Sequence, residues 1–311
     1  MCSLIKSRCH IKFICLFLIP AELRYTSNPV LVQTIGTRAA IEENKQIRGT
    51  AIVDSELFIV SHESSEVEAY DLVKLVFSRR WKLKELSKPQ DIGSCSRNRC
   101  LYIPDYKGTG QSNRILRVDI NGKLISKWSI GDDLGYCLSV TDESNVILTV
   151  HSKNKLNEYA SDGQLIREIN FSSVAGILYP WNAIKLTNGN FMVSHGRFAS
   201  EPHRVCVVDA EGNLKKSFGS GVVSSIRNLC EPVDMAIDGN GFVMVLDRGN
   251  SRVLLLDSDL QFKKEILSKE SHGLRSPCGI SLDETNGRLF VSNFQSKNKL
   301  YKCGAISVFQ L

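Results

Sequence analysis

Residues 232–257 read PVDMAIDGNGFVMVLDRGNSRVLLLD, and the residues around Phe262 add a fourth apolar run. Each run is short, rich in aliphatic residues and bounded by Gly, Asn, Asp or Ser. Such runs predict antiparallel strands joined by tight turns rather than helices. The stretch therefore predicts one sheet of four consecutive strands.

This four-strand pattern occurs six times along the chain. The second strand of each copy ends in a polar residue, called the slot residue below. The slot residues are His62, Asp105, His151, His195, Asp247 and Asn293, and successive ones lie 43 to 52 residues apart. That period is typical of propeller blades and is much longer than a leucine-rich repeat. We expect each slot residue to form hydrogen bonds within its own loop, as Asp and Asn often do.

The outermost strand of each blade is predicted from two bulky residues four apart, which share one face of a strand. The pairs are Phe77/Trp81, Leu124/Trp128, Leu165/Ile169, Leu214/Phe218 and Phe262/Ile266. The sixth repeat has no such strand after it, and VLVQTIG at residues 30–36 supplies the pair Leu31/Ile35. The sequence therefore predicts an all-β, six-bladed propeller of four-stranded blades, closed by the N-terminal strand 30–36.

The predicted propeller covers residues 28–311. Its blades lie at about 48–88, 89–133, 134–176, 177–229, 230–273, and 274–311 plus 30–38. Residues 1–27 have a basic start and an apolar run from Phe13 to Pro20 that is too short to span a bilayer. They are interpreted as a poorly packed leader of a cytoplasmic protein, and the alternative is the signal peptide of a secreted propeller scaffold. Cys95 and Cys100 flank a tight turn and would form a disulfide only in an oxidising compartment.

The repeats resemble a known family. Residues 232–257 are similar to an NHL repeat, with Pro and Asp opening the first strand and Asp, Asn and an Arg-Val run after the second. NRILRVDINGKL at 113–124 is a second copy. Residues 30–311 resemble the C-terminal propeller of tripartite-motif (TRIM) NHL proteins, which implies an RNA- or protein-binding module associated with ubiquitination. The chain has no RING or B-box array and no coiled-coil heptads, so we expect no ligase activity in it.

Basic residues gather in the loops that join second and third strands, called the 2–3 loops below. The predicted binding residues are Lys107, Arg114, Lys153, Lys155, Arg197, Arg204, Arg248 and Arg252, and the last repeat adds Lys297, Lys299 and Lys302. Because these loops share one face of a propeller, that face is predicted to be electropositive and to bind an acidic protein surface or single-stranded RNA. The alternative is that Arg114, Arg204, Arg252 and Lys155, at equivalent positions, pack over their own blades.

The repeat pattern argues against a catalytic metal site. A zinc ion shared by His62, His151 and His195 is disfavoured, because equivalent positions on neighbouring blades lie on the order of 10 Å apart and zinc needs ligands within about 2.1 Å. An amidating lyase or lactonase on this fold would need a metal in the central channel, where Asp91, Asn182 and Asp234 are interpreted as turn residues. We therefore expect a monomeric, non-catalytic interaction platform with no metal, no cofactor and no membrane partner, and the metal-dependent enzyme is the alternative.

Overall fold

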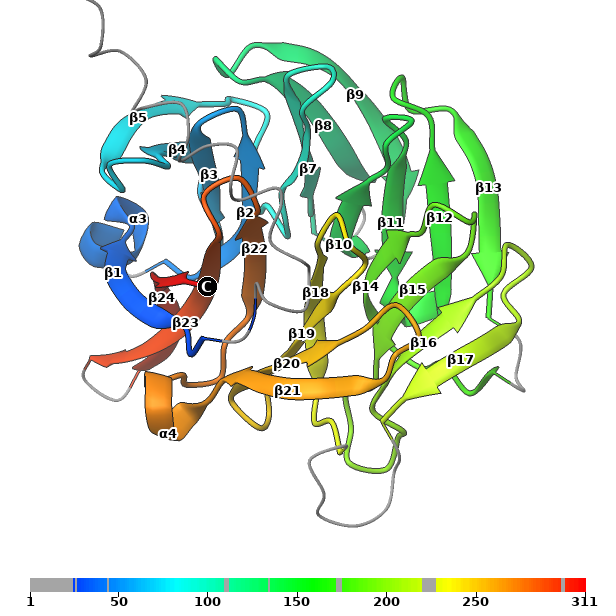
Figure 1. Cartoon of the computed structure of the whole chain (residues 1–311). Helices are drawn as coiled ribbons and strands as arrows, with labels where there is room; N and C mark the ends of the chain where they lie inside the picture. Colours follow the sequence, from blue (N-terminus) through cyan, green and yellow to red (C-terminus); the bar gives the residue numbers. More distant parts are fainter. Residues whose placement is uncertain are drawn as a thin grey trace, which may run out of the picture.

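The computed structural model describes residues 25, 27–43, 45–108, 112–133, 135–171, 175–219, 228–297 and 300–311. These residues form six four-stranded antiparallel sheets arranged in a ring (Figure 1). The chain is therefore a six-bladed β-propeller, as the repeat period predicts.

The strands follow the chain in order. Blade 1 consists of β2 (Ile47–Val53), β3 (Glu56–Ser61), β4 (Glu66–Asp71) and β5 (Phe77–Lys82); blade 2 of β6 (Gly93–Cys95), β7 (Cys100–Asp105), β8 (Asn113–Asp119) and β9 (Leu124–Gly131). Blade 3 consists of β10 (Gly135–Val140), β11 (Val146–Val150), β12 (Lys155–Tyr159) and β13 (Leu165–Asn170); blade 4 of β14 (Pro180–Lys185), β15 (Phe191–His195), β16 (Arg204–Val208) and β17 (Leu214–Phe218). Blade 5 consists of β18 (Pro232–Ile237), β19 (Val243–Asp247), β20 (Arg252–Leu256) and β21 (Phe262–Leu267); blade 6 of β22 (Gly279–Asp283), β23 (Arg288–Lys297), β24 (Leu300–Gln310) and β1 (Val30–Gly36). Among the described residues, three short helices lie between strands: α3 (Arg38–Glu43), η1 (His151–Lys153) and α4 (Lys269–His272).

The first strand of every blade faces the ring centre. β2, β6, β10, β14, β18 and β22 each contact the first strands of both neighbouring blades, so they form a closed inner ring (Figure 1). This ring surrounds a channel, which contains a cavity. The second strands are almost entirely buried; β11, β15 and β19 contain no exposed position. These strands lie between an inner and two outer strands and between two neighbouring blades, which explains their continuous apolar runs.

Strand β1 closes the ring. It pairs antiparallel with β24 from Val30 opposite Gln310 to Gly36 opposite Ala305, and it forms the outermost strand of blade 6. The predicted closing strand 30–36 is confirmed with the same bounds. Residues from the two ends of the chain thus share one sheet, so the ring is held by hydrogen bonds between strands that are distant in sequence.

The predicted pairs on the outermost strands are only half right. The second residue is buried in four pairs, for example Ile169 and Ile35, and half-buried in the two pairs that end in tryptophan. The first residue is exposed in Phe77, Leu165 and Leu31. A register shift in β13 places one extra residue between Leu165 and Arg167, and the other outer strands shift similarly. Because a bulge breaks the alternation of faces, residues four apart need not both reach the core. Leu124, Leu214 and Phe262, the first residues of the other three pairs, are half-buried and pack at its edge.

Tryptophans on two outermost strands pack against the neighbouring blade. The ring of Trp81 in blade 1 lies over Gly122 in blade 2, where a Cβ would approach ring carbon Cδ2 within 2.6 Å. Trp128 lies in the same way over Gly163 of blade 3, at 2.5 Å. Both glycines have positive φ, 87° and 97°, so the turn needs glycine for its backbone as well as for the space.

Tyr25 lies inside the predicted leader, yet it packs on the propeller. Its ring is 6% exposed and contacts Phe242 edge to face at 5.6 Å, and its hydroxyl donates to Asp238 Oδ2 at 2.8 Å. The packed structure therefore extends further toward the N-terminus than the predicted boundary at residue 27. Apart from Tyr25 and Ser27, the predicted leader lies outside the described residues.

The cysteines of the described residues are of two kinds. Cys95 and Cys100 stand directly opposite one another in β6 and β7, and both are free and buried. Cys278, at the start of blade 6, is disulfide-bonded. In the part of the chain that the structure describes, no helix is long and apolar enough to cross a membrane.

Candidate binding face and central channel

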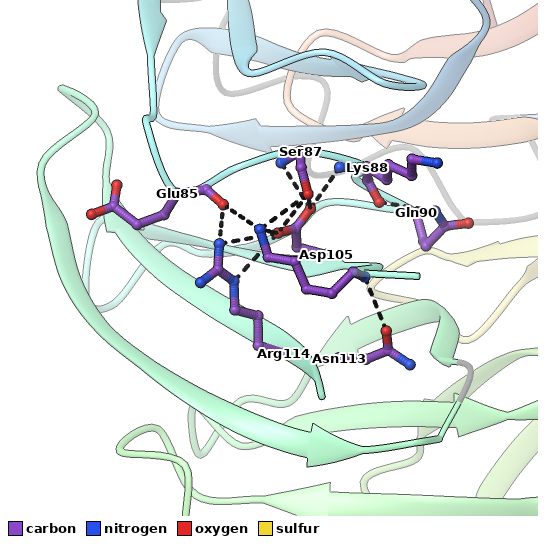
Figure 2. A network of polar contacts seen from close by, with 8 residues as sticks. Glu85, Ser87, Lys88, Gln90, Asp105, Asn113 and Arg114 are labelled. Carbon is purple, nitrogen blue, oxygen red and sulfur yellow. Dashed lines mark hydrogen bonds and ion pairs between the residues drawn. The ribbon is translucent and has the colours of Figure 1, made fainter. Parts of the chain in front are cut away.

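The slot residue Asp105 holds its own blade to the incoming connector. Its side chain is fully buried, and Oδ1 accepts backbone hydrogen bonds from Ser87 and Lys88 at 2.9 and 2.7 Å (Figure 2). Arg114 Nε donates to Oδ2 at 3.3 Å, and Lys107 Nζ lies 3.3 Å from the same oxygen. One carboxylate thus fixes the start of the blade, its second strand and its third strand together.

The same arrangement recurs in later blades. Asp247 Oδ1 accepts from the backbone of Cys230 at 2.7 Å, and its Oδ2 accepts from Arg252 Nε at 2.7 Å. Asn293 Oδ1 accepts from the backbone of Arg275 at 2.7 Å. These three slot residues therefore bind the connector that precedes their blade, and not only their own loop as the sequence suggests.

Four of the predicted binding residues lie at the first or second position of third strands, and their side chains bind groups of this chain. Arg114, Arg204 and Arg252 donate to connector carbonyls: Arg114 to Glu85, Arg204 to Ala175 and Gly176, and Arg252 to Asn228. Lys155 at the equivalent place forms ion pairs with Asp133 and Glu168. All four side chains are largely buried, so most of their hydrogen-bonding capacity serves the fold.

Three more of the predicted binding residues have carboxylate or carbonyl partners. Lys107 donates to the Glu85 carbonyl and to Ser87 Oγ, both at 3.1 Å. Lys153 pairs with Asp133, and Arg248 Nε lies 3.8 Å from Glu231 Oε2. The 2–3 loop face is therefore less electropositive than its lysines and arginines alone predict. The side chains of Lys297, Lys299 and Lys302 lie outside the described residues.

Arg197 differs from the other seven because its guanidinium lies over aromatic rings. Its Cζ is 5.4 Å from the centroid of Phe198 and 5.9 Å from that of Trp181. Phe198 is 48% exposed and meets Tyr179 edge to face at 5.2 Å. We call Arg197, Phe198, Tyr179 and Trp181 the aromatic patch. It is a half-buried group of three rings with one exposed guanidinium at its surface.

The loop that carries this patch is held by side chains. Glu201 Oε2 accepts from the backbone of Arg197 and Phe198 at 3.1 and 3.2 Å. His203 Nδ1 accepts from the Glu231 backbone at 2.9 Å, which leaves the proton on Nε2, 3.0 Å from the Phe198 carbonyl. Neutral His203 thus ties the 2–3 loop of blade 4 to the start of blade 5, a role that the sequence does not reveal.

The dense His and Cys content of blade 4 serves packing. His195 and Cys206 lie on paired strands with Nε2 and Sγ 3.5 Å apart, whereas His203 binds the connector. Burial lowers the pKa of His195 to about 3 and raises the pKa of the Cys206 thiol to about 12. Among the described residues, no three His, Cys, Asp or Glu side chains come together in a way that would hold a metal ion.

Asp91, Asn182 and Asp234, predicted to be turn residues, instead line the central channel. Asn182 and Asp234 lie in the first strands β14 and β18, and Asp91 lies two residues before β6. With Gly49, Cys137 and Gly279, these positions are called the channel ring. Where the connector ends in proline, the ring residue follows two positions later, so the sequence contains a signal for these positions.

The carboxylates of the channel ring bridge neighbouring blades. Asp91 Oδ2 accepts from the Leu138 backbone at 2.8 Å, and Asp234 Oδ2 accepts from the Ile280 backbone at 2.9 Å. Asn182 Nδ2 donates to Asp234 Oδ1 at 2.8 Å. Burial raises the pKa of Asp234 to about 7, and burial with the charge of Asp234 raises the pKa of Asp91 well above its ordinary value.

Comparison with known proteins places the chain among propellers. No family model and no curated protein matches it. The fold is similar to hydrazine synthase of Kuenenia stuttgartiensis, with a TM-score of 0.61 and 11% identity over 86% of this chain and 96% of that one. Virginiamycin B lyase of Staphylococcus aureus matches with a TM-score of 0.58 and 10% identity over 90% and 98%.

A protein of unknown function from Bacteroides caccae is also similar, with a TM-score of 0.57 and 13% identity over 81% of this chain and 94% of that one. These identities support the fold alone. The likeness of the repeats to NHL and TRIM propellers has no support among these matches, and the function must be argued from the residues of this chain.

Proposed function

We propose that the protein is a non-catalytic platform that binds an acidic segment of another protein through the aromatic patch on its 2–3 loop face. The aromatic patch carries this proposal. Arg197 is held over two rings, with its guanidinium exposed beside Phe198. Arginine and aromatic residues dominate the binding energy of protein interfaces, and an exposed guanidinium accepts a carboxylate in bidentate geometry.

The charge of the surrounding face favours a protein over RNA. Affinity for RNA rises with the number of phosphates that lysine and arginine neutralise. Arg114, Arg252 and Lys155 are already neutralised by Asp105, Asp247, Asp133 and Glu168. A short acidic segment needs only one or two charged contacts together with apolar contact to Phe198, and the patch offers both.

In this proposal the chain acts as a recognition module, in the way that the resemblance to TRIM-type propellers implies, and contributes no chemistry of its own. The loop anchors Glu201 and His203 support the proposal, because they fix the backbone that carries Arg197 and Phe198 before any partner binds. A pre-ordered loop lowers the entropy cost of association.

A peptide selection tests this proposal. The purified chain is used to select binders from a random peptide library, and the affinities of the selected peptides are measured by fluorescence anisotropy. We expect peptides with Asp or Glu beside an apolar residue. Arg197→Glu and Phe198→Ala should each weaken binding about tenfold or more.

Lys127→Glu, an equal change of charge on the exposed outer strand β9, serves as the matched control and should leave affinity unchanged. A labelled oligouridine is measured in parallel. Equal affinities of the Arg197→Glu and Lys127→Glu variants would overturn the assignment of the face. Salt-sensitive oligouridine binding without peptide binding would replace protein by RNA as the partner.

A further inference from the structure

A cavity of about 680 Å³ occupies the channel on the side away from the 2–3 loops. Its lining extends from Asp91, Asn182 and Asp234 of the channel ring to the turns between first and second strands at Asp54 and Asp283–Asn286. In antiparallel blades these turns and the 2–3 loops lie at opposite ends of the strands. The cavity is therefore separate from the aromatic patch, and an inference about it does not depend on the proposed function.

The lining of this cavity is acidic in a chain whose net charge is +6. It includes the carboxylates of Asp54, Asp91, Asp234, Asp283 and Glu284 and the hydroxyls of Thr50, Ser94, Ser139 and Ser281. None of the described residues that line it is Lys, Arg or His. At the rim, Arg99 pairs with Asp54 at 2.9 Å, and Arg288 donates to the carbonyls of Leu72 and Val73, which also line the cavity. Carboxylates that share a low-dielectric cavity concentrate cations within it.

Asn182 supplies an independent sign of a ligand. The residue is only 6% exposed, and its Nδ2 is fixed by the hydrogen bond to Asp234. That bond orients the amide, and its Oδ1 is buried without a hydrogen-bond partner among the described residues. A buried acceptor without a donor costs about 1–3 kcal/mol. A ligand that carries N–H groups would satisfy it.

The acceptors are spread too widely for a metal ion. Asp91 belongs to blade 2 and Asp234 to blade 5, which lie opposite one another in a ring of six. A bound Ca²⁺ needs six to eight oxygens at roughly 2.3–2.6 Å. No cluster of three His, Cys, Asp or Glu in the described residues meets such a requirement. Separated carboxylates and amide oxygens instead suit a flexible organic cation with several N–H donors along its length.

We propose that this cavity binds a linear oligoamine, with ammonium groups on Asp91 and Asp234 at the floor and on the acidic turn at Asp283 and Glu284. The Asn182 amide oxygen accepts a further hydrogen bond from the same ligand. The serine and threonine hydroxyls around the wall serve as additional acceptors. The ligand enters from the face opposite the 2–3 loops, so it does not compete with a partner on the aromatic patch.

Isothermal titration calorimetry with spermidine tests this inference, with Ca²⁺, Mg²⁺ and Zn²⁺ as parallel titrants at low salt. Spermidine should bind with one-to-one stoichiometry. Asp234→Asn should weaken it about tenfold or more, while Asp142→Asn, an exposed turn residue outside the cavity, should not change it. If Asp234→Asn does not fold, Glu284→Gln at the rim gives the same comparison.

Asn182→Leu keeps every carboxylate but removes both the orphaned acceptor and the N–H donor to Asp234. It should weaken spermidine by a smaller factor than the loss of a carboxylate does. Equal spermidine binding by wild type, Glu284→Gln, Asp234→Asn and Asp142→Asn would mean that the amine binds the surface at large and would overturn the inference. Binding of a metal ion without spermidine, or of neither titrant, would overturn it as well.

Discussion

Replacing Asp105 by alanine should destabilise the propeller strongly while leaving its binding face chemically unchanged. The Asp105 side chain is fully buried and accepts hydrogen bonds from two backbone N–H groups, with the charges of Arg114 and Lys107 beside it. Removing one partner of a buried ion pair costs about 3–5 kcal/mol, because the other charge stays buried. The two backbone N–H groups that lose their acceptor are included in this range. We therefore expect Asp105→Ala to lower the free energy of unfolding by about 3–5 kcal/mol.

Urea denaturation followed by tryptophan fluorescence measures this loss. The midpoint should fall and the slope should stay constant, because the surface exposed on unfolding does not change. Asp142→Asn, at an exposed turn, is the control and should lie within about 0.5 kcal/mol of wild type. A loss below about 1 kcal/mol for Asp105→Ala would refute the view that slot residues bind the blades to their connectors.

Three further outcomes are expected. Deleting residues 1–37 removes β1 and should lower the melting temperature markedly, whereas deletion of residues 1–24 keeps Tyr25 and should not; equal melting temperatures would exclude ring closure by β1. Asp234 has a pKa near 3.8 in the unfolded chain and about 7 in the folded protein, so the folded state keeps its proton to higher pH. The free energy of unfolding should therefore fall as pH rises from about 4 to 7, by at most about 4 kcal/mol. Asp234→Asn should flatten that slope in pH-dependent urea titrations, and an unchanged slope would assign it to other groups. Arg252→Ala should lower the urea midpoint, and Arg197→Ala should leave it within error, because only Arg252 binds a buried carboxylate; the reverse order would contradict the division between structural and binding arginines.

The propeller could be predicted from the sequence because its blades repeat and five of its second strands end at or directly before a polar slot residue. In blade 6, β23 continues past Asn293 to Lys297. The closing strand followed from counting: the sixth repeat lacked an outermost strand, and residues 30–36 matched it. The bulges could not be predicted, since a single extra residue leaves the apolar pattern intact while it turns Leu165 toward solvent. Tyr25 was missed because its contacts with Phe242 and Asp238 are distant in sequence.

The candidate sites were harder to predict because Asp, Asn, Arg and Lys serve several purposes. In the sequence, Asp91 and Asp234 resemble turn residues. They line one channel because the six blades close into a ring. Arg204 and Arg197 are both arginines of the same blade, yet the first binds connector carbonyls and the second lies over aromatic rings. A count of positive charges in the loops cannot separate the two cases, because it does not reveal which carbonyl or carboxylate lies within reach.

The most direct test of binding at the aromatic patch is an NMR titration of the three tryptophan indole N–H signals with a selected acidic peptide. Trp181 belongs to the patch and donates its indole N–H to the Gly196 carbonyl at 2.9 Å, whereas Trp81 and Trp128 lie over Gly122 and Gly163 between blades. The Trp181 signal should shift in a saturable way that Arg197→Glu abolishes, while the signals of Trp81 and Trp128 stay in place. Binding that leaves the Trp181 signal unmoved, or that moves the other two instead, would contradict the proposed site.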